Sequence, residues 1–288
     1  MSAVTARDEQ SGQEFAFGDK DFRFLSATIY EKTGIVLKDH KKNMVYSRLA
    51  RRLRELRLNR FSDYCALLKS REGADEVGFL INAITTNLTK FFREAHHFDH
   101  LKEVVLPEVS HLAASTGQNR LRIWSAGCSS GEEPYSIAMT LTQAMPRLKT
   151  WDARILASDL DTTMVARGKA GIYPASSIAD LPAGYRNRFF GKAPGAGDSF
   201  QAADGVRDLI AFKKLNLLGP WPMRGPFDAI FCRNVMIYFD EPTKAKLIDR
   251  FCDMLRPGGW LYIGHSETLL DVQSQFELKG RTVYRRKG

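Results

Sequence analysis

Four short apolar runs alternate with helical patterns in the second half of the chain, and this alternation limits the fold more than any other feature. The runs are LRIWSAG (121–127), ARILAS (153–158), FDAIFC (227–232) and WLYIGH (260–265). Helical periodicity lies between them, at Glu132–Met145 and Glu241–Leu255. Strands and helices that alternate in this way build a parallel sheet wound by helices, an α/β fold. Residues 276–286 add two strand-like runs around a Lys-Gly pair, which predicts a closing hairpin.

The chain divides by pattern into regions of different character, and its 288 residues fit roughly two domains. Residues 1–18 are polar and are predicted to be disordered. Residues 19–92 repeat apolar side chains at helical spacing, which predicts an N-terminal helical domain. Residues 93–120 predict one amphipathic connecting helix, which leads into the sheet domain at 121–288. Within that domain, prolines and glycines interrupt the alternation over about 172–215, which indicates a small inserted β-subdomain.

Positive charge is concentrated in one predicted helix of the helical domain. Lysine and arginine number 42 against 33 acidic residues, a net charge of +9, and the segment 38–60 alone holds nine cations against two acids. The apolar residues of this segment recur on one helical face. The arginines that flank or oppose that face are predicted to dock an acidic partner, and they are Arg48, Arg51, Arg54 and Arg57. Charge alone leaves a nucleic acid, an anionic membrane and an acidic protein helix open as partners.

Several other classes of protein are disfavoured by what the sequence lacks. No stretch approaches roughly 18 uninterrupted apolar residues, so we expect no membrane insertion. The N-terminal residues have no apolar signal-peptide core, which predicts a cytoplasmic protein. The four cysteines lie 63, 104 and 20 residues apart, without zinc-ligand or redox spacing. His96 and His100 have metal-ligand spacing without a third acidic ligand, so we expect no metal site. Together with His97, they are expected at the surface or as helix caps.

The sharpest local signal is a glycine loop between the first apolar run and the helix that follows it. Gly127 and Gly131 enclose three residues, and Pro134 falls in the first turn of the helix. Glycines at this place let the backbone approach a ligand at the positive end of a helix. A tight strand-to-helix turn without a ligand is the alternative that the loop alone leaves open. The second apolar run ends at Asp159, where doubly wound sheets hold an acid that accepts both ribose hydroxyls of a nucleoside.

These features together resemble class I S-adenosylmethionine-dependent methyltransferases, whose cofactor is a nucleoside without phosphates. That chemistry explains why the dinucleotide and P-loop fingerprints are missing. Three longer motifs are more specific, and they are TTNLTKFFRE (85–94), SSGEEPYS (129–136) and FDAIFCRNVMIYFD (227–240). With these motifs the chain resembles the chemotaxis receptor methyltransferases, the CheR family, over about residues 20–285.

The resemblance implies a function in the adaptation of bacterial chemotaxis. Methyl groups would pass from S-adenosyl-L-methionine, leaving S-adenosyl-L-homocysteine, to glutamate side chains on the cytoplasmic helices of chemoreceptors, the methyl-accepting chemotaxis proteins. The products would be glutamate methyl esters. We expect a monomer that binds no nucleic acid. In the family the inserted subdomain can carry a strand that docks a receptor tail, and residues 191–205 here are glycine-rich and not diagnostic.

The resemblance also assigns residues to the cofactor site, and they are Asn87, Thr89, Arg93, Gly127, Glu133, Asp159, Asn216, Leu217, Arg233 and Asn234. Glu133 would hold the amino-acid end of the cofactor, and Asp159 its ribose. Asn216 and Leu217 would lie against the adenine, with Arg233 and Asn234 beside them. Asn87, Thr89 and Arg93 would reach the cofactor or the methyl group that is transferred.

The expected chemistry needs no general base, because a glutamate side chain with a pKa near about 4.3 is already an anionic nucleophile at neutral pH. Catalysis would rest on aligning that carboxylate with the sulfonium methyl. Arg93 is a candidate clamp for the carboxylate and Tyr238 could orient it, although a surface ion pair and a packed ring are the alternatives. Cys232 is expected to fill the strand end rather than to act as a nucleophile. A nucleic-acid methyltransferase and a non-catalytic signalling module remain as rival functions.

Overall fold

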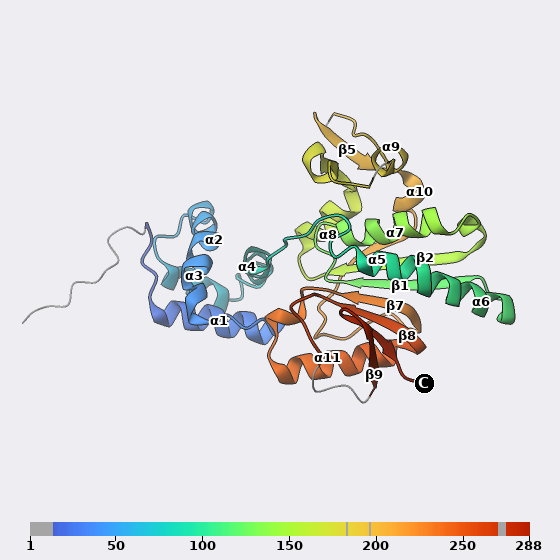
Figure 1. Cartoon of the computed structure of the whole chain (residues 1–288). Coiled ribbons are helices and arrows are strands. Elements are labelled where there is room, and N and C mark those ends of the chain that lie inside the picture. Colours follow the sequence, from blue (N-terminus) through green and yellow to red (C-terminus); the bar gives the residue numbers. More distant parts are fainter. Residues whose placement is uncertain (1–13, 183, 196, 270–274) are drawn as a thin grey trace, which may run out of the picture. The chain divides into compact units, whose positions relative to one another are not determined.

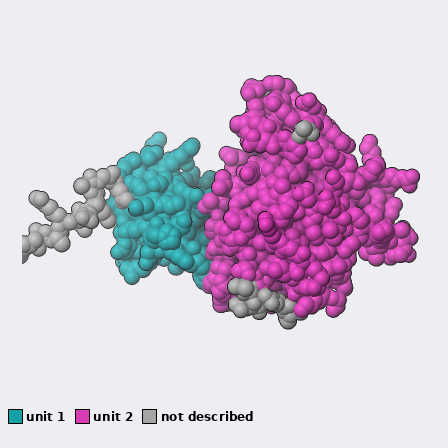
Figure 2. All heavy atoms as spheres, viewed as in Figure 1, with its two compact units in different colours: residues 1–85 teal, residues 86–288 magenta. Residues whose placement is uncertain are grey.

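The computed structural model describes residues 14–182, 184–195, 197–269 and 275–288. The chain forms two compact units, which meet in sequence at Thr85 and Thr86 (Figure 2). The sequence predicted this division at residue 92, with a linker up to residue 120. Residues 86–120 instead belong to the larger unit, because their apolar side chains complete the core of that unit. The helical residues up to Thr85 are called unit 1 below, and the residues from Thr86 are called unit 2.

Unit 1 is the predicted helical bundle. Its helices are α1 (Asp19–Thr33), a short 3-10 turn η1 (Asp39–Lys41), α2 (Lys42–Glu55), α3 (Phe61–Lys69) and α4 (Glu76–Ile84). The apolar face predicted for the basic segment is buried, since Val45, Leu49 and Leu53 of α2 are 0% exposed. Gly34 ends α1 in a left-handed conformation with φ 72°, as its place after the apolar pattern predicted.

The N-terminal segment corrects one prediction. Residues 1–13 lie outside the described residues, but residues 14–18 are packed rather than disordered. Phe15 is 7% exposed and Phe17 is 1% exposed, and the ring of Phe17 lies 4.2 Å from that of Phe61. Ala16 forms a backbone bridge with Arg60. Two aromatic residues two positions apart fit an extended segment with one buried face, a signal that the overall polarity of residues 1–18 concealed.

Unit 2 is built on a seven-stranded sheet in the order β6-β2-β1-β7-β8-β10-β9 (Figure 1). The strands are β1 (Arg120–Ala126), β2 (Asp152–Asp159), β6 (Ile210–Lys214), β7 (Phe227–Cys232), β8 (Leu255–Ile263), β9 (Phe276–Gly280) and β10 (Val283–Arg286). The first five in the sheet order are parallel, and β10 is antiparallel to both β8 and β9. The order reverses direction between β1 and β7, and ligands of doubly wound sheets bind beside such a reversal.

Helices cover both faces of this sheet. On one face lie α7 (Glu132–Ala144) and a continuous helix made of α5 (His96–His100), a π-helical turn η2 (Leu101–Val105) and α6 (Leu106–Thr116), and on the other lies α11 (Glu241–Met254) (Figure 1). Successive strand residues divide between the faces, so Ile123 packs with the first group and Trp124 with α11. The remaining helix, α8 (Thr162–Ala170), follows β2 and packs on β2 and β6. No helix within the described ranges is long and apolar enough to cross a bilayer.

The inserted subdomain is real but shorter than predicted. A three-stranded antiparallel sheet has the order β3-β5-β4, and its elements are β3 (Ile172–Pro174), η4 (Ala175–Ile178), α9 (Tyr185–Phe189), β4 (Phe190–Lys192), β5 (Ser199–Ala202) and α10 (Asp204–Arg207). The prediction extended the insertion to residue 215, which wrongly included β6. That strand is the edge of the main sheet, and its residues are half-buried or exposed, so it lacks the continuous apolar run that marks a central strand.

Candidate active site at the carboxyl ends of the strands

The loop after β1 requires both of its predicted glycines. Gly127 has φ 87°, and a Cβ on it would lie 2.4 Å from Cγ2 of Val235. Gly131 has φ 101° and precedes α7, and a Cβ there would lie 2.8 Å from the Tyr173 hydroxyl. A side chain at either position would therefore collide with the loop's neighbours as well as strain the backbone. The loop stays close-packed and keeps the positive end of α7 near the sheet edge.

Asp159 lies at the tip of β2, beside this loop. Its carboxylate accepts the backbone N–H of Ser129 at 2.7 Å and that of Asp161 at 2.9 Å. Burial raises the pKa of Asp159, while these two backbone hydrogen bonds favour its ionised form. An ionised carboxylate has about four lone-pair sites, so roughly two remain for hydroxyl donors. The acceptor oxygens of this edge therefore fit the hydroxyl donors of a ribose.

The motif TTNLTKFFRE (85–94) is hydrogen-bonded to the same loop. Asn87 donates from Nδ2 to the Asp161 carboxylate at 2.9 Å. The backbone carbonyl of Asn87 accepts a hydrogen bond from the Ser129 hydroxyl at 3.0 Å. Further along, the Phe92 N–H donates to the hydroxyl of Ser136 on α7 at 2.9 Å. Thr89 between them is half-buried. Two motifs separated by some 40 residues in the sequence are thus brought together, as the resemblance implied.

Glu133 and Arg233 form a buried ion pair at the centre of the site. The carboxylate of Glu133 accepts the Ser125 hydroxyl at 2.6 Å and Arg233 Nη1 at 3.1 Å. Burial raises the pKa of Glu133, and the charge of Arg233 opposes that rise. The Arg233 side chain is 3% exposed, and it also donates to the carbonyl of Arg93 and lies 3.4 Å from Glu94. The resemblance implied a place for Arg233 beside the adenine residues, and in the structure its guanidinium contacts Glu133.

Asn216 and Leu217 follow β6 on the adenine side of the predicted site. The turn is held by Asn216, whose side chain accepts the Leu218 N–H at 3.0 Å, and Leu217 is 8% exposed. Arg250 of α11 donates to the carbonyls of Leu217 at 2.6 Å and Gly219 at 2.7 Å. Sequence reasoning missed Arg250, because nothing in a helical pattern tells which arginine caps a distant loop.

The loop after β7 carries Asn234 and Tyr238, and a buried glutamate holds it. Asn234 has φ 60°, and its N–H donates to Glu267 at 2.9 Å, as does that of Ile237 at 3.2 Å. Glu267 is 8% exposed and follows β8. Tyr238 ends the 3-10 turn η5 (Met236–Tyr238) and is half-buried. Glu267 was also missed, although an acid directly after a buried strand was a signal that could have found it.

Arg93 differs from Arg233 in that it stays partly open to solvent. Its Nη1 donates to the Leu88 carbonyl at 2.9 Å.

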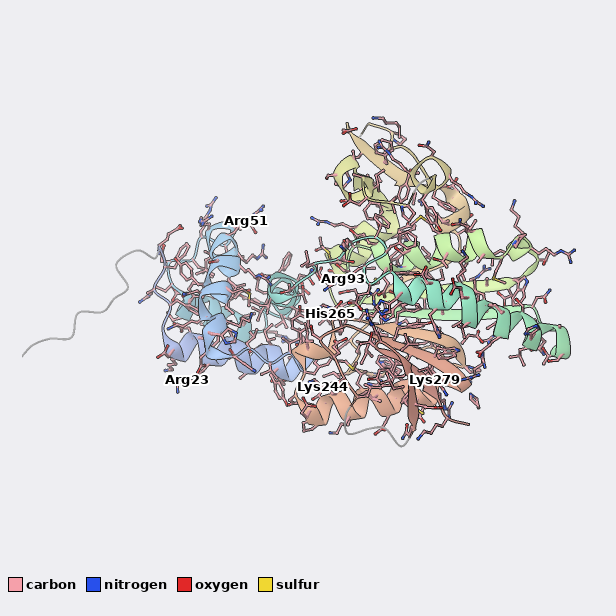
Figure 3. The ribbon with its side chains drawn as sticks, in the orientation of Figure 1. Arg23, Arg51, Arg93, Lys244, His265 and Lys279 are labelled. Atoms are coloured by element: carbon pink, nitrogen blue, oxygen red, sulfur yellow. The ribbon has the colours of Figure 1, made fainter. Side chains whose placement is uncertain are left out.

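The arginines predicted to dock a partner lie in unit 1 and differ in exposure. Arg48 is directed inward and donates to the backbone carbonyls of Ile84 at 2.6 Å and Thr85 at 2.8 Å. It thus supplies hydrogen bonds to carbonyl groups at the C-terminal end of α4. Arg51, Arg54 and Arg57 are exposed, and Figure 3 shows Arg51 directed away from the bundle.

Of the three histidines predicted at the surface or as helix caps, His97 is buried instead. His97 is fully buried, and burial lowers its pKa to about 3, so it is neutral at physiological pH. His96 bonds the Arg281 carbonyl and His100 bonds the Tyr262 hydroxyl, so the pair at metal spacing is engaged elsewhere. Side-chain atoms that could bind one metal ion come together at Glu94, His96 and His97. The guanidinium of Arg233 already contacts the Glu94 carboxylate, however. The absence of a metal therefore stays a prediction.

Cys128 and Cys232 are buried at the strand ends. Burial raises the pKa of both thiols well above the ordinary value. A thiol that is neither exposed nor ionised is a poor nucleophile. The chemistry of this edge is thus that of carboxylates, amides and guanidinium groups.

A seven-stranded sheet with one antiparallel strand, a glycine loop after β1 and an acid at the tip of β2 define a class I S-adenosylmethionine-dependent methyltransferase. Residues 20–85 match the family described as CheR methyltransferase, all-alpha domain, and residues 87–285 match CheR methyltransferase, SAM binding domain. The chain belongs to the CheR methyltransferase family. It is therefore an S-adenosylmethionine-dependent methyltransferase of chemotaxis.

Named relatives match along nearly the whole chain. The chain is 45% identical over 259 residues to a probable chemotaxis protein methyltransferase of Rhizobium etli, covering 89% of this chain and 96% of the relative. It is 42% identical to the chemotaxis protein methyltransferase of Escherichia coli strain K12, covering 96% of this chain and 93% of the relative. Identity to chemotaxis protein methyltransferase 2 of Pseudomonas aeruginosa is also 42%, with 99% of each chain covered.

Proposed function

We propose that this enzyme methylates glutamate side-chain carboxylates on the cytoplasmic helices of chemoreceptors and produces methyl esters. The observation that carries the proposal is that the segment bearing Arg93 is fastened to the cofactor loop through Asn87 and Ser129. A guanidinium is well suited to bind a carboxylate, so the position of Arg93 on this segment supports its role as the clamp. Matches to both domains of a family named for chemotaxis methyltransferases support the same substrate.

When bound, S-adenosylmethionine supplies an electrophilic methyl group on a sulfonium. A substrate carboxylate oxygen would form the new C–O bond as the C–S bond breaks, the electron pair would stay on sulfur, and no proton would be released. The enzyme's residues therefore have only to align the carboxylate and exclude competing orientations. Arg93 clamps the carboxylate, and the Tyr238 hydroxyl orients it by a hydrogen bond.

The roles of the cofactor residues are those that membership of the family implies. Asp159 accepts the ribose hydroxyls, and Asn216 with Leu217 contacts the adenine. Glu133 holds the ammonium group at the amino-acid end. Arg233 acts through Glu133, because its guanidinium favours the ionised form of that carboxylate and holds it in place. Gly127, Thr89 and Asn234 complete the walls of the site.

Recognition of the receptor is assigned to unit 1. The exposed arginines Arg51 and Arg54 of α2, and Arg57 just after it, face an acidic helix that carries the substrate glutamates. Arg48 supports this surface from beneath by fixing α4 against α2. We further propose that the enzyme works as a cytoplasmic monomer and that nucleic acids are not its substrates.

The test is the chemistry of the product. Receptor-containing fractions are incubated with the enzyme and S-adenosylmethionine labelled in the methyl group, then treated with mild alkali. A carboxyl methyl ester releases volatile labelled methanol, whereas N-methyl and C-methyl products keep the label. Label that survives alkali, or label found on added nucleic acid, would overturn the proposal. Cofactor binding without any transfer would show a signalling module instead.

A further inference from the structure

Both neighbours of Arg93 have an unusual backbone conformation. Phe92 has φ 50° and Glu94 has φ 57°, which is the left-handed region that side chains other than glycine seldom adopt. Such conformations persist only where the surroundings hold them, and they are frequent at active sites. The direction of the Arg93 side chain thus depends on what fixes the residues on either side of it.

The contacts of Glu94 fix the C-terminal side. One carboxylate oxygen accepts His265 Nδ1 at 3.0 Å and the His265 N–H at 3.4 Å, and the other lies 3.4 Å from Arg233. The Glu94 side chain is 11% exposed. Burial opposes its ionisation, but the hydrogen bond from His265 and the charge of Arg233 hold the pKa of Glu94 below its usual value. The acceptor therefore stays charged and its hydrogen bonds stay strong.

Of the two side chains that contact the Glu94 carboxylate oxygens described above, Arg233 is buried and His265 is exposed. It follows β8, and its side chain is 65% exposed, whereas every other contact of Glu94 is buried. Since a carboxylate only accepts, Nδ1 of His265 carries the proton in this hydrogen bond. Figure 3 shows Arg93 and His265 on the same part of unit 2. A histidine from the loop after β8 thus reaches the segment that bears the proposed clamp.

We infer that Glu94 and His265 are positioning residues for methyl transfer, which act by holding the backbone on the C-terminal side of Arg93 so that its guanidinium meets the substrate carboxylate. The inference rests on the role proposed for Arg93. It predicts an effect on turnover rather than on cofactor binding, because neither residue belongs to the ribose or adenine contacts. A displacement of about 1 Å in a positioning group can lower a rate by up to about 100-fold.

The test uses His265 because an exposed side chain can be removed without opening the core. His265→Ala removes the donor, His265→Asn keeps an N–H donor near the position of Nδ1, and His111→Ala removes an exposed histidine on α6 as a control. We expect His265→Ala to lower kcat about 10-fold. Its KM for S-adenosylmethionine and its melting temperature should stay near those of the wild type. Activity should be restored largely by His265→Asn and should be untouched by His111→Ala.

A double-mutant cycle with Arg93→Ala tests the route of the effect. If His265 acts through Arg93, His265→Ala lowers kcat in the wild type but adds nothing in the Arg93→Ala enzyme. Equal losses in both backgrounds, or a normal kcat for His265→Ala, would overturn the inference while the proposed function stands. Near-normal turnover by Arg93→Ala would overturn the role proposed for Arg93 itself, and the inference with it.

Discussion

Arg51 of unit 1 and Arg233 of unit 2 place the same guanidinium in opposite surroundings. The Arg51 side chain is 84% exposed and pairs with Glu55 one turn along the same helix, at 3.0 Å. The Arg233 side chain is 3% exposed and pairs with Glu133 at 3.1 Å. Water screens the first pair, so it contributes little to stability, whereas breaking a buried pair like the second costs about 3–5 kcal/mol.

The difference separates recognition from chemistry. Exposed arginines with only screened, weak ion pairs can exchange those partners for the acidic side chains of a receptor helix. Their charge acts over about 8–10 Å at physiological ionic strength. A buried arginine with several fixed partners cannot leave them, so it serves to hold other groups in place. On this account, changes in unit 1 alter how the receptor is bound, and changes around Arg233 alter stability and turnover.

The largest expected effect is that of Arg233→Ala. Removing the guanidinium leaves the carboxylates of Glu133 and Glu94 buried without their cation, so the free energy of unfolding should fall by about 3–5 kcal/mol. Arg51→Ala is the control and should change it by less than about 0.5 kcal/mol. Denaturant unfolding measures both. Similar small losses for the two variants would erase the distinction between the buried and the exposed arginine.

Next in size is the effect of Arg93→Ala on turnover. Its side chain is partly open and donates only to the Leu88 carbonyl among the hydrogen bonds of the described residues, so thermal stability should change little. Losing the clamp should lower kcat on the receptor by about 100-fold. Lys90→Ala, an exposed residue of the same motif, is the matched control. The assignment fails if Arg93→Ala transfers methyl groups at a rate close to that of the control.

Asp159→Ala should weaken the cofactor rather than the receptor. Loss of a charged acceptor for two ribose hydroxyls costs about 1.5–3 kcal/mol, or about 10- to 150-fold in affinity for S-adenosylmethionine. Asp152→Ala, at the opposite end of β2, removes an exposed carboxylate from the same strand and should leave the affinity unchanged. Calorimetric titration distinguishes the two. Unchanged affinity in Asp159→Ala would remove this residue from the site.

The smallest effect is expected for the double change Arg51→Glu and Arg54→Glu. It alters the charge of the α2 surface by four without touching Val45, Leu49 or Leu53, so folding and cofactor affinity should stay near those of the wild type. The KM for receptor should rise about tenfold, while kcat stays within about twofold. The same charge change on α1, made with Lys20→Glu and Arg23→Glu, is the control. Equal effects of both pairs would show that only net charge matters.

The sequence predicted those parts of the fold that depend on burial. Central strands such as β1 and β7 are buried along nearly their whole length, and the apolar face of α2 packs as its spacing indicated. The edge strand β6 was taken into the insertion, because an edge strand needs no apolar run. Phe15 and Phe17 were assigned to a disordered segment, because two aromatic residues give too short a pattern to outweigh polar neighbours.

For the candidate site, the motifs named residues that the structure gathers at the carboxyl edge of the sheet, but they did not give the partners of those residues. Which carboxylate a buried arginine meets depends on loops that follow different strands, so the pairing of Arg233 with Glu133 could not be predicted. The same holds for Glu267, which binds a loop 30 residues away or more. His97 was expected at the surface, because a histidine in a helix does not show whether its face of the helix is buried.

The division between recognition and chemistry is tested most directly by a salt series of receptor methylation. KM and kcat are measured for the wild type and for the Arg51→Glu, Arg54→Glu enzyme from low to high ionic strength. If α2 recognises an acidic receptor helix, the wild-type KM rises with salt, the KM of the variant starts high and changes little, and kcat is the same for both throughout. Equal KM values for the two enzymes at low salt would contradict the account and would leave the basic helix as a solvated surface.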